Sequence, residues 1–427
     1  MILTIRPLFT NILILPFLWL HLLCLVNLPG TNGWRRDLVQ PNGFILTSNY
    51  FGLNLLDQLT KENERNQQKE NIFFSPYSVS IALAMLHQGS VGQTSHQLET
   101  TLGYQLAKLN GNKSLVSWQI RKFTQELISE DSNSTSFVLR TGNALITDQK
   151  FAILDSYKKN LNQNFYANLF SADFITSGED VQKLINDWCF NQTNGKISML
   201  LTKPPSPDTK MALLNAIYFK GIWKLKFDPN QTEEGIFYGI NGEKFEHVPF
   251  MKAKDYFNVG NLAEIDADLV ELQYEGEELS FYAILPREKN SELKLIKKAL
   301  NPWYVEAAIS RSYSQEIELK LPKLDLKKNY QLVDSLKALG IEDVFGQKSN
   351  LSALSTEPNL AVDEVKHVAS IEVNEEGSEA AASTYIGIVR LSLQLNTPVY
   401  AFDHPFLFFI RQNKNGQILF IGEINGF

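Results

Sequence analysis

Cysteine is scarce in this chain of 427 residues, which contains only two. Cys24 lies in an apolar N-terminal run, so removal of that run would leave Cys189 alone and exclude an internal disulfide. Cys189 follows Trp188 in an apolar-periodic stretch, and this position favours a buried structural thiol over a reactive one. A chain of this length can bury a core large enough to be stable without disulfides, even in an oxidising compartment.

The motifs of common enzyme families are also absent from the sequence. It has no G-x-S-x-G nucleophile elbow, no H-E-x-x-H metal site, no Walker A loop and no G-x-G-x-x-G dinucleotide motif. We therefore expect neither an enzyme nor a bound metal or cofactor, although a catalytic triad assembled from distant residues stays open. His367 lies among apolar residues, which favours a structural role. After the N-terminal run, no histidine is at metal-ligand spacing from another among His87, His96, His247, His367 and His404.

The sequence also lacks an excess of positive charge. Its formal net charge is −7, so we expect no binding of a nucleic acid through bulk charge. With 44% hydrophobic and 20% charged residues, the composition is that of an ordinary globular protein. No internal repeat or low-complexity segment is present, and length alone suggests two or three domains.

An apolar run at residues 12–26 dominates the N-terminus. It has about 15 residues, which suits the core of a signal peptide better than a membrane span of about 20 residues. Thr-Asn-Gly at residues 31–33 gives a small-x-small pattern, so we predict cleavage after Gly33, with Gly30 as a less regular option. An uncleaved membrane anchor is the alternative to this prediction.

Five N-x-S/T sequons follow the apolar run and predict a glycoprotein. Each one is a weak signal because the pattern arises by chance, but five behind a signal peptide favour glycosylation. We therefore expect a signal peptide at residues 1–33 and a secreted, extracellular chain at residues 34–427. The predicted glycosylation sites are Asn112, Asn133, Asn191, Asn230 and Asn350.

Hydrophobic periodicity predicts helices early in the chain and strands late. Residues 46–59 and 115–129 have the helical period, and residues 78–87 are apolar nearly all round, which predicts a buried helix. Residues 211–219 predict a buried strand, and two apolar runs around Asn415-Gly416 predict a hairpin. This order of elements indicates an α+β fold with large antiparallel or mixed sheets.

The segment Glu375–Ser392, EEGSEAAASTYIGIVRLS, has a helix-forming first half and a strand-forming second half. As a strand it would have two different faces: alternate residues from Ser378 to Ile388 carry no charge and begin with small side chains, whereas the other face, from Glu379 to Val389, carries Glu379. Gly377 supplies a permissive backbone just before this strand, and no proline interrupts it. A strand that slides into a sheet is as well supported here as a surface helix or an alanine-rich linker.

Four further stretches, in this order, resemble signatures of the serpin family. They are NIFFSPYSVSIALAM at 71–85, NAIYFKGIW at 215–223, FDHPFLFFI at 402–410 and ILFIGEI at 418–424, and the segment after residue 374 resembles the family's hinge and reactive-centre loop. The resemblance covers nearly the whole mature chain. It implies an α+β serpin fold, with about nine helices around three β-sheets, as a single domain at 34–427 with an exposed reactive-centre loop at about 375–398.

The same resemblance implies a suicide inhibitor that forms a covalent complex with a target serine protease. The protease cuts the loop as a substrate, and the cut loop inserts into the main sheet before the acyl-enzyme is hydrolysed. The residues that match the hinge of inhibitory members are Glu376, Gly377, Ser378, Glu379, Ala380, Ala381 and Ala382. Those that match the polar cluster beneath the opening of the sheet are Ser75, Ser78, Asn215 and His367, and Trp223 matches the tryptophan near its top.

Counting from the hinge predicts the cleaved bond. In the family the bond usually follows the fourteenth residue after the hinge glycine, which from Gly377 is Leu391. We therefore predict the bond Leu391–Ser392 and a chymotrypsin-like target. A count shorter by one gives Arg390–Leu391 and a trypsin-like target. A non-inhibitory serpin that acts as a carrier or binding protein is a further alternative, which the hinge argues against.

Two small basic groups suggest a second kind of partner. One consists of Lys320, Lys323, Lys327 and Lys328, and the other of Arg121 and Lys122 in a predicted helix. Both are compatible with weak binding of a sulfated polysaccharide, but a solvated charged face is the more common meaning of such groups. Apart from these partners, we expect a monomer that binds no nucleic acid and no membrane.

Overall fold

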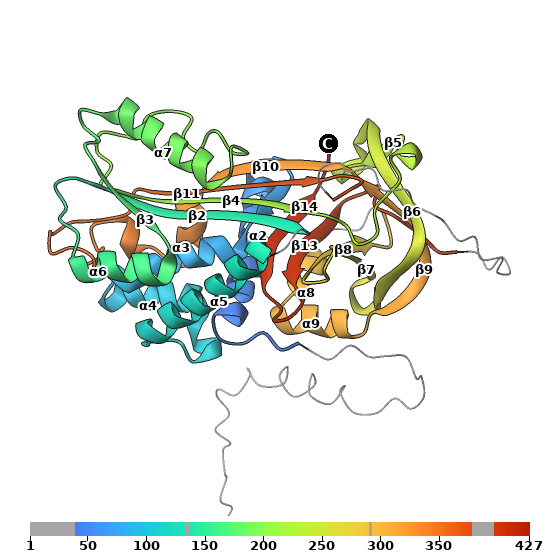
Figure 1. Cartoon of the computed structure of the whole chain (residues 1–427), viewed down its shortest axis with the longest axis horizontal. Coiled ribbons are helices and arrows are strands. Elements are labelled where there is room, and N and C mark those ends of the chain that lie inside the picture. Colours follow the sequence, from blue (N-terminus) through green and yellow to red (C-terminus); the bar gives the residue numbers. More distant parts are fainter. Residues whose placement is uncertain (1–38, 134–135, 290–292, 378–396) are drawn as a thin grey trace, which may run out of the picture. The chain divides into compact units, whose positions relative to one another are not determined.

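The computed structural model of the protein describes residues 39–133, 136–289, 293–377 and 397–427 (Figure 1). The predicted signal peptide lies outside these residues, and so do Ser378–Ala382 of the predicted hinge and the predicted bonds at residues 390–392. Within the described ranges, no helix combines the length and the apolar character that a membrane span requires.

Nine α-helices occur in the described part of the chain, most of them in its first half. The central one, α3, begins after Ser75, whose hydroxyl accepts a hydrogen bond from the Ser78 amide at 3.1 Å, and Pro76 occupies its first turn. All of its residues are buried, as the apolar sequence predicts. The helices are α2 (Gly43–Arg65), α3 (Pro76–Gly89), α4 (Gly92–Thr101), α5 (Lys113–Asn133), α6 (Asp155–Asn160), α7 (Gly178–Gln192), α8 (Leu293–Ala299), α9 (Pro302–Ser310) and α10 (Val333–Ala338).

A five-stranded sheet lies between α7 on one face and α3 on the other (Figure 1). On the α7 face, Val181, Ile185 and Trp188 pack with apolar residues of the sheet such as Leu214 and Val368. In spatial order the strands are β10 (Leu324–Gln331), β11 (Glu364–Val373), β4 (Met211–Gly221), β2 (Phe137–Asp148) and β3 (Asn168–Ala172).

A second sheet of nine strands is built around the long strand β6. The first residues of β6 pair with β5, its middle pairs with β9, and its last residues pair with β7. The strands are β1 (Ile72–Phe74), β14 (Ile418–Ile424), β13 (Phe406–Gln412), β8 (Leu279–Pro286), β7 (Ala267–Gln273), β6 (Lys244–Leu262), β9 (Tyr313–Pro322) and β12 (Val399–Ala401), with β5 (Glu233–Tyr238) paired to β6.

The structure confirms the α+β class, the buried helix and the hairpin around Asn415-Gly416, which is β13–β14. Two details differ from the expectation. Helix α2 runs from Gly43 to Arg65 and so extends beyond the predicted residues 46–59 at both ends. Among the described residues the strands form two hydrogen-bonded sheets where three were expected, because the long strand β6 pairs with β5, β9 and β7 and so joins them in one sheet.

Candidate functional site

The strands β4 and β11 are parallel neighbours in the middle of the five-stranded sheet. Eight residue pairs join them, from Glu364–Ala212 to Ile371–Phe219. Past the last pair, β11 continues to Val373 beside β10 alone, and β4 continues to Gly221 beside β2 alone. The two central strands therefore part at this end, which is also the end where the chain leaves β11 toward the predicted hinge.

Trp223, two residues beyond β4, anchors the chain that leaves β11. Its side chain is 1% exposed and stacks on Tyr274 with 4.4 Å between ring centroids. Its indole Nε1 donates to the Asn374 carbonyl at 2.8 Å, and its backbone amide donates to the Glu376 carbonyl at 3.0 Å. Trp223 therefore fixes the start of the predicted hinge by both its side chain and its backbone.

Gly377 lies at the parted end of the two strands. Its φ is +94°, in the left-handed region that favours glycine. A Cβ atom at this position would lie 2.2 Å from the Gly221 carbonyl oxygen and 2.6 Å from the Trp223 nitrogen, which are both backbone atoms. Only glycine fits this close approach, so the glycine of the predicted hinge sits against the end of β4.

Glu375 ties the same stretch to two other elements. Its carboxylate accepts a hydrogen bond from the Thr232 hydroxyl at 2.7 Å and forms an ion pair with Lys323 at 2.9 Å. Burial acts to raise the pKa of Glu375, but the bonds from Thr232 and Lys323 outweigh burial and lower it. The charged carboxylate thus joins the hinge to the start of β5 and to the turn between β9 and β10.

The four residues predicted as a polar cluster meet beneath the joined part of β4 and β11. His367 of β11 accepts the Ser75 backbone amide at its Nε2, with 3.1 Å between the nitrogens, and its Nδ1 is bonded to the Asn215 side-chain oxygen. The Asn215 amide of β4 donates to the Ser78 hydroxyl and to Asn143 Oδ1, the latter at 2.7 Å. One hydrogen-bonded chain therefore links α3, β4 and β11.

This arrangement requires a neutral His367. Nε2 accepts a hydrogen bond and so carries no proton, which leaves the proton on Nδ1 as the donor to Asn215. Complete burial lowers the pKa of His367 to about 3, in agreement with a neutral ring. Sequence reasoning favoured a structural role for His367 over a catalytic one. In the structure both ring nitrogens of His367 are engaged in hydrogen bonds that join β11 to α3 and to β4.

The remaining predicted positions are distributed over the surface and the core. Asn112, Asn191, Asn230 and Asn350 are exposed, whereas the side chain of Asn133 lies outside what the structure describes. Cys189 is buried, and burial raises the pKa of its thiol to about 12, as expected of a structural cysteine.

The structure contradicts the idea that the four lysines between 320 and 328 form one patch. Lys320 belongs to β9 of the large sheet, where it covers the Phe250 ring at 4.5 Å, whereas Lys327 and Lys328 belong to β10 of the other sheet. Lys328 pairs with Glu70 at 2.8 Å, and Lys323 is engaged with Glu375. Neighbours in sequence were separated because the chain changes sheets at residue 323.

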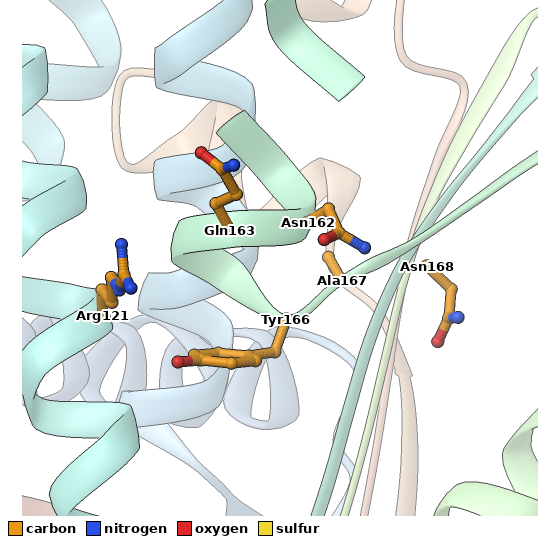
Figure 2. Close-up of a pocket in the computed structure, with 6 residues that line it drawn as sticks. All are labelled: Arg121, Asn162, Gln163, Tyr166, Ala167 and Asn168. Atoms are coloured by element: carbon orange, nitrogen blue, oxygen red, sulfur yellow. The ribbon is translucent and has the colours of Figure 1, made fainter. Parts of the chain in front are cut away.

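Arg121 of the second basic group lines a pocket of about 500 Å³ (Figure 2). Arg121 and Tyr166 both reach into this pocket, which lies between α5 and the π-helical turn Leu161–Phe165. The adjacent Lys122 instead packs over the Trp118 ring at 5.6 Å. The complete lining is Arg121, Asn162, Gln163, Tyr166, Ala167 and Asn168.

Sequence reasoning missed several residues of the site. Asn143 bonds to the predicted Asn215, whereas Thr232 of the Asn230 sequon and Lys323 of the predicted basic group bond to Glu375. Each of the three is far from its partner in the sequence. Glu375 was part of the quoted segment without being given a role. No signal in a single sequence pairs such residues, because the pairing arises only from the packing of the sheets.

Comparison with known proteins identifies the family. The model of the family described as "Serpin (serine protease inhibitor)" matches residues 46–426. Iripin-8 of Ixodes ricinus is 39% identical over 383 residues, covering 88% of this chain and 92% of that protein. Intracellular coagulation inhibitor 1 of Tachypleus tridentatus is 35% identical, covering 89% and 88%. Crystalline uncleaved ovalbumin, at 26% identity, superposes with a TM-score of 0.78 over 90% of this chain and all of that one.

These matches correct one hypothesis that the sequence left open. An enzyme with a triad of distant residues is overturned, because the matched family is described as an inhibitor of proteases and not as a catalyst. The match spans more than half of the chain, the relatives are more than 30% identical over most of their length, and the fold agrees. The chain therefore belongs to the serpin family of serine protease inhibitors.

Proposed function

We propose that this protein is a secreted inhibitory serpin that traps a serine protease by inserting its own cut loop as a strand between β4 and β11. The observation that carries the proposal is the position of Gly377, which is wedged at the point where these two strands part. A chain that leaves β11 there and folds back enters the gap directly. It would run antiparallel to both neighbours, which is the stronger mode of pairing.

The reaction begins as an ordinary proteolysis. The protease serine attacks the carbonyl carbon of Leu391, an ester bond forms, and the amine of Ser392 leaves with a proton. Once the bond is cut, residues 378–391 are no longer joined to Ser392 and can enter the sheet. They would add a strand of about 14 residues and roughly 45 Å. The protease is carried with the strand, and its distorted active site no longer hydrolyses the ester.

Insertion has an identifiable barrier in this chain. The eight residue pairs between β4 and β11 must separate, and so must the bond of His367 to Asn215, which links the two strands across the line of opening. The bond from the Ser75 amide ties His367 to the start of α3. We assign Ser75, Ser78, Asn215 and His367 the role of a gate that keeps the sheet closed until the loop is cut. Trp223 and Glu375 fix the chain at the parted end of β4 and β11, where the cut loop would enter the sheet.

One experiment separates the inhibitor from a carrier. The protein is incubated with chymotrypsin and with trypsin, and the products are resolved on a denaturing gel. An inhibitor gives a covalent complex and releases a peptide that begins at Ser392, whereas a peptide beginning at Leu391 assigns the bond to Arg390–Leu391. Cleavage without any complex would contradict the trapping mechanism.

We also propose export and glycosylation, supported by the apolar run at 12–26 and by the exposure of Asn112, Asn191, Asn230 and Asn350. The two Tachypleus relatives are named intracellular inhibitors, so localisation needs its own test. Expression of the full chain in insect cells should yield a protein in the medium that begins at Trp34 and loses mass on treatment with an N-glycosidase. A protein retained in the cells with an intact N-terminus would refute export.

A further inference from the structure

A second buried histidine lies in the last turn of α3, a helix that packs against α4 and α5 (Figure 1). The side chain of His87 is fully buried, and its ring packs edge-to-face against Tyr104, with 5.2 Å between ring centroids. Tyr104 begins the short 3₁₀ turn η1 (Tyr104–Ala107), which lies between α4 and α5 in the chain. We call the four residues His87, Glu99, Tyr104 and Lys113 the helix corner.

Glu99 of α4 joins two parts of the helix corner. Its Oε1 lies 2.9 Å from Nε2 of His87 and accepts the Gly111 backbone amide at 3.0 Å. A charged carboxylate only accepts hydrogen bonds, so Nε2 of His87 carries the proton and Nδ1 carries none. Among the residues that the structure describes, no group bonds to this buried Nδ1, and none bonds to the buried Tyr104 hydroxyl. A further proton on Nδ1 would therefore have no acceptor.

Lys113 attaches the start of α5 to the end of α3. Its Nζ donates to the Ser90 carbonyl and, at 3.4 Å, to the Gln88 carbonyl, which both lie at the carboxyl end of α3. The Gln88 side chain in turn donates to the Lys113 carbonyl at 3.2 Å. A cation at this end complements the helix dipole. Lys113 therefore places one positive charge beside the turn of the helix that carries His87.

We propose that the helix corner is a pH switch, in which protonation of His87 releases residues 103–113 from the end of α3 while the two sheets stay folded. The protonated ring would be a buried cation whose Nδ1–H lacks an acceptor, which is a costly state. It would also repel Lys113, and the one carboxylate of Glu99 can neutralise only one of the two cations. Opening of the helix corner would expose the ring to water and separate the two positive charges.

The direction of the switch follows from the groups that face the ring. Burial lowers the pKa of His87 and the charge of Lys113 lowers it further, whereas Glu99 acts to raise it and is outweighed. Burial lowers the pKa of Lys113 as well. The closed corner therefore binds a proton less readily than an open corner, in which a histidine titrates near 6.5. Opening becomes more favourable as the pH falls below about 6.5, by at most about tenfold per pH unit.

The test is amide hydrogen exchange of the whole protein at pH 7.5 and at pH 5.0, with rates corrected for the intrinsic effect of pH on exchange. In the wild type we expect the protection of residues 103–113 to decrease about tenfold at the lower pH. In His87→Gln the decrease should be less than about twofold, because the glutamine amide keeps a donor for Glu99 but does not titrate. The amides of β13 and β14 should keep their protection in both proteins.

The matched control is His96→Gln, the same substitution at an exposed histidine of α4. It should respond to acid like the wild type. An equal response in His87→Gln and wild type, or no response in the wild type, would overturn the switch. So would an equally large loss of protection in β13 and β14, because the acid effect would then be unfolding of the whole protein.

A second variant tests the switch without altering the histidine. Lys113→Met removes the cation that would repel protonated His87, and it also removes the attachment of α5 to α3. We expect residues 103–113 to exchange faster than in the wild type at pH 7.5, but to respond less to acid, because Glu99 then neutralises His87 alone. An acid response in Lys113→Met as large as that of the wild type would contradict the repulsion on which the switch depends.

Discussion

At the scale of single residues, His367 makes the stability of the closed sheet depend on pH. Its pKa is lowered to about 3 in the folded protein, whereas an unfolded histidine titrates near 6.5. Between these values the unfolded chain binds the extra proton, so the free energy of unfolding decreases as the pH falls. The contribution of His367 is complete above about pH 6.5 and is lost progressively toward pH 3.

We therefore expect His367→Gln to flatten the pH dependence of unfolding. In the wild type this residue contributes up to about 1.4 kcal/mol per pH unit below pH 6.5, and glutamine contributes none because its amide does not titrate. The measurement is urea unfolding of both proteins at half-unit steps from pH 7.5 to pH 4.5. Other groups, including the buried His87 whose pKa is also lowered, are common to both proteins and cancel in the difference. Parallel curves would exclude His367 as the titrating group.

A second prediction at this scale concerns the ion pair of Glu375 and Lys323. Glu375→Gln keeps the acceptor for Thr232 but removes the charge, and Lys323→Met keeps most of the side-chain volume. Because Lys323 is partly exposed, a double-mutant cycle should give a coupling free energy of about 1 kcal/mol in urea unfolding. This coupling should shrink in 1 M salt, where exposed charges are screened. Additive effects of the two substitutions would show that the pair does not stabilise the hinge.

At the scale of elements, the strand proposed to insert would have a buried face and an exposed face, and one pair of variants can distinguish the two. Ser378→Arg places a charge on the face that would enter the sheet core, whereas Glu379→Arg changes the charge on the opposite face. We expect Ser378→Arg to be cut as a substrate, with a stoichiometry of inhibition raised at least about tenfold because an unpaired charge costs several kcal/mol to bury. Glu379→Arg should still trap the protease.

The readout is the ratio of covalent complex to cleaved protein on a denaturing gel across a titration with protease. Efficient trapping by Ser378→Arg would refute insertion in the proposed register. Equal loss in both variants would show that any arginine near the hinge is harmful, whichever face it occupies.

The elements also show how far sequence reasoning reaches. Period and turn chemistry predicted α3, β4 and the β13–β14 hairpin, because these depend on neighbours in the chain. The parallel pairing of β4 with β11 joins residues about 150 positions apart, as in His367 with Asn215, and no local pattern carries that information. The polar cluster around His367 could be predicted only through resemblance to a family. The hydrogen bond between Thr232 and Glu375 could not be predicted at all.

At the scale of the whole molecule, the proposed trapping mechanism requires the five-stranded sheet to accept one further strand between β4 and β11. Joining β4 to β11 satisfies eight residue pairs, but an inserted strand would pair along both of its edges and bury the apolar face that begins at Ser378. The closed form is therefore expected to be metastable. The barrier to separating β4 from β11 would keep the sheet closed, although the form with the inserted strand would have the lower free energy.

Cleavage of the loop should accordingly make the protein more heat-resistant. A metalloprotease such as thermolysin, which forms no acyl-enzyme and cannot be trapped, is used to cut the loop, and calorimetry compares the intact and the cut protein. We expect the thermal midpoint to rise by about 10 °C or more, since each added kcal/mol raises the midpoint of a large domain by about 2 °C. Cut Ser378→Arg should gain much less, because its charge opposes insertion. An unchanged midpoint in the cut wild type would mean that the loop stays outside the sheet, and the chain would then be a serpin that binds without trapping.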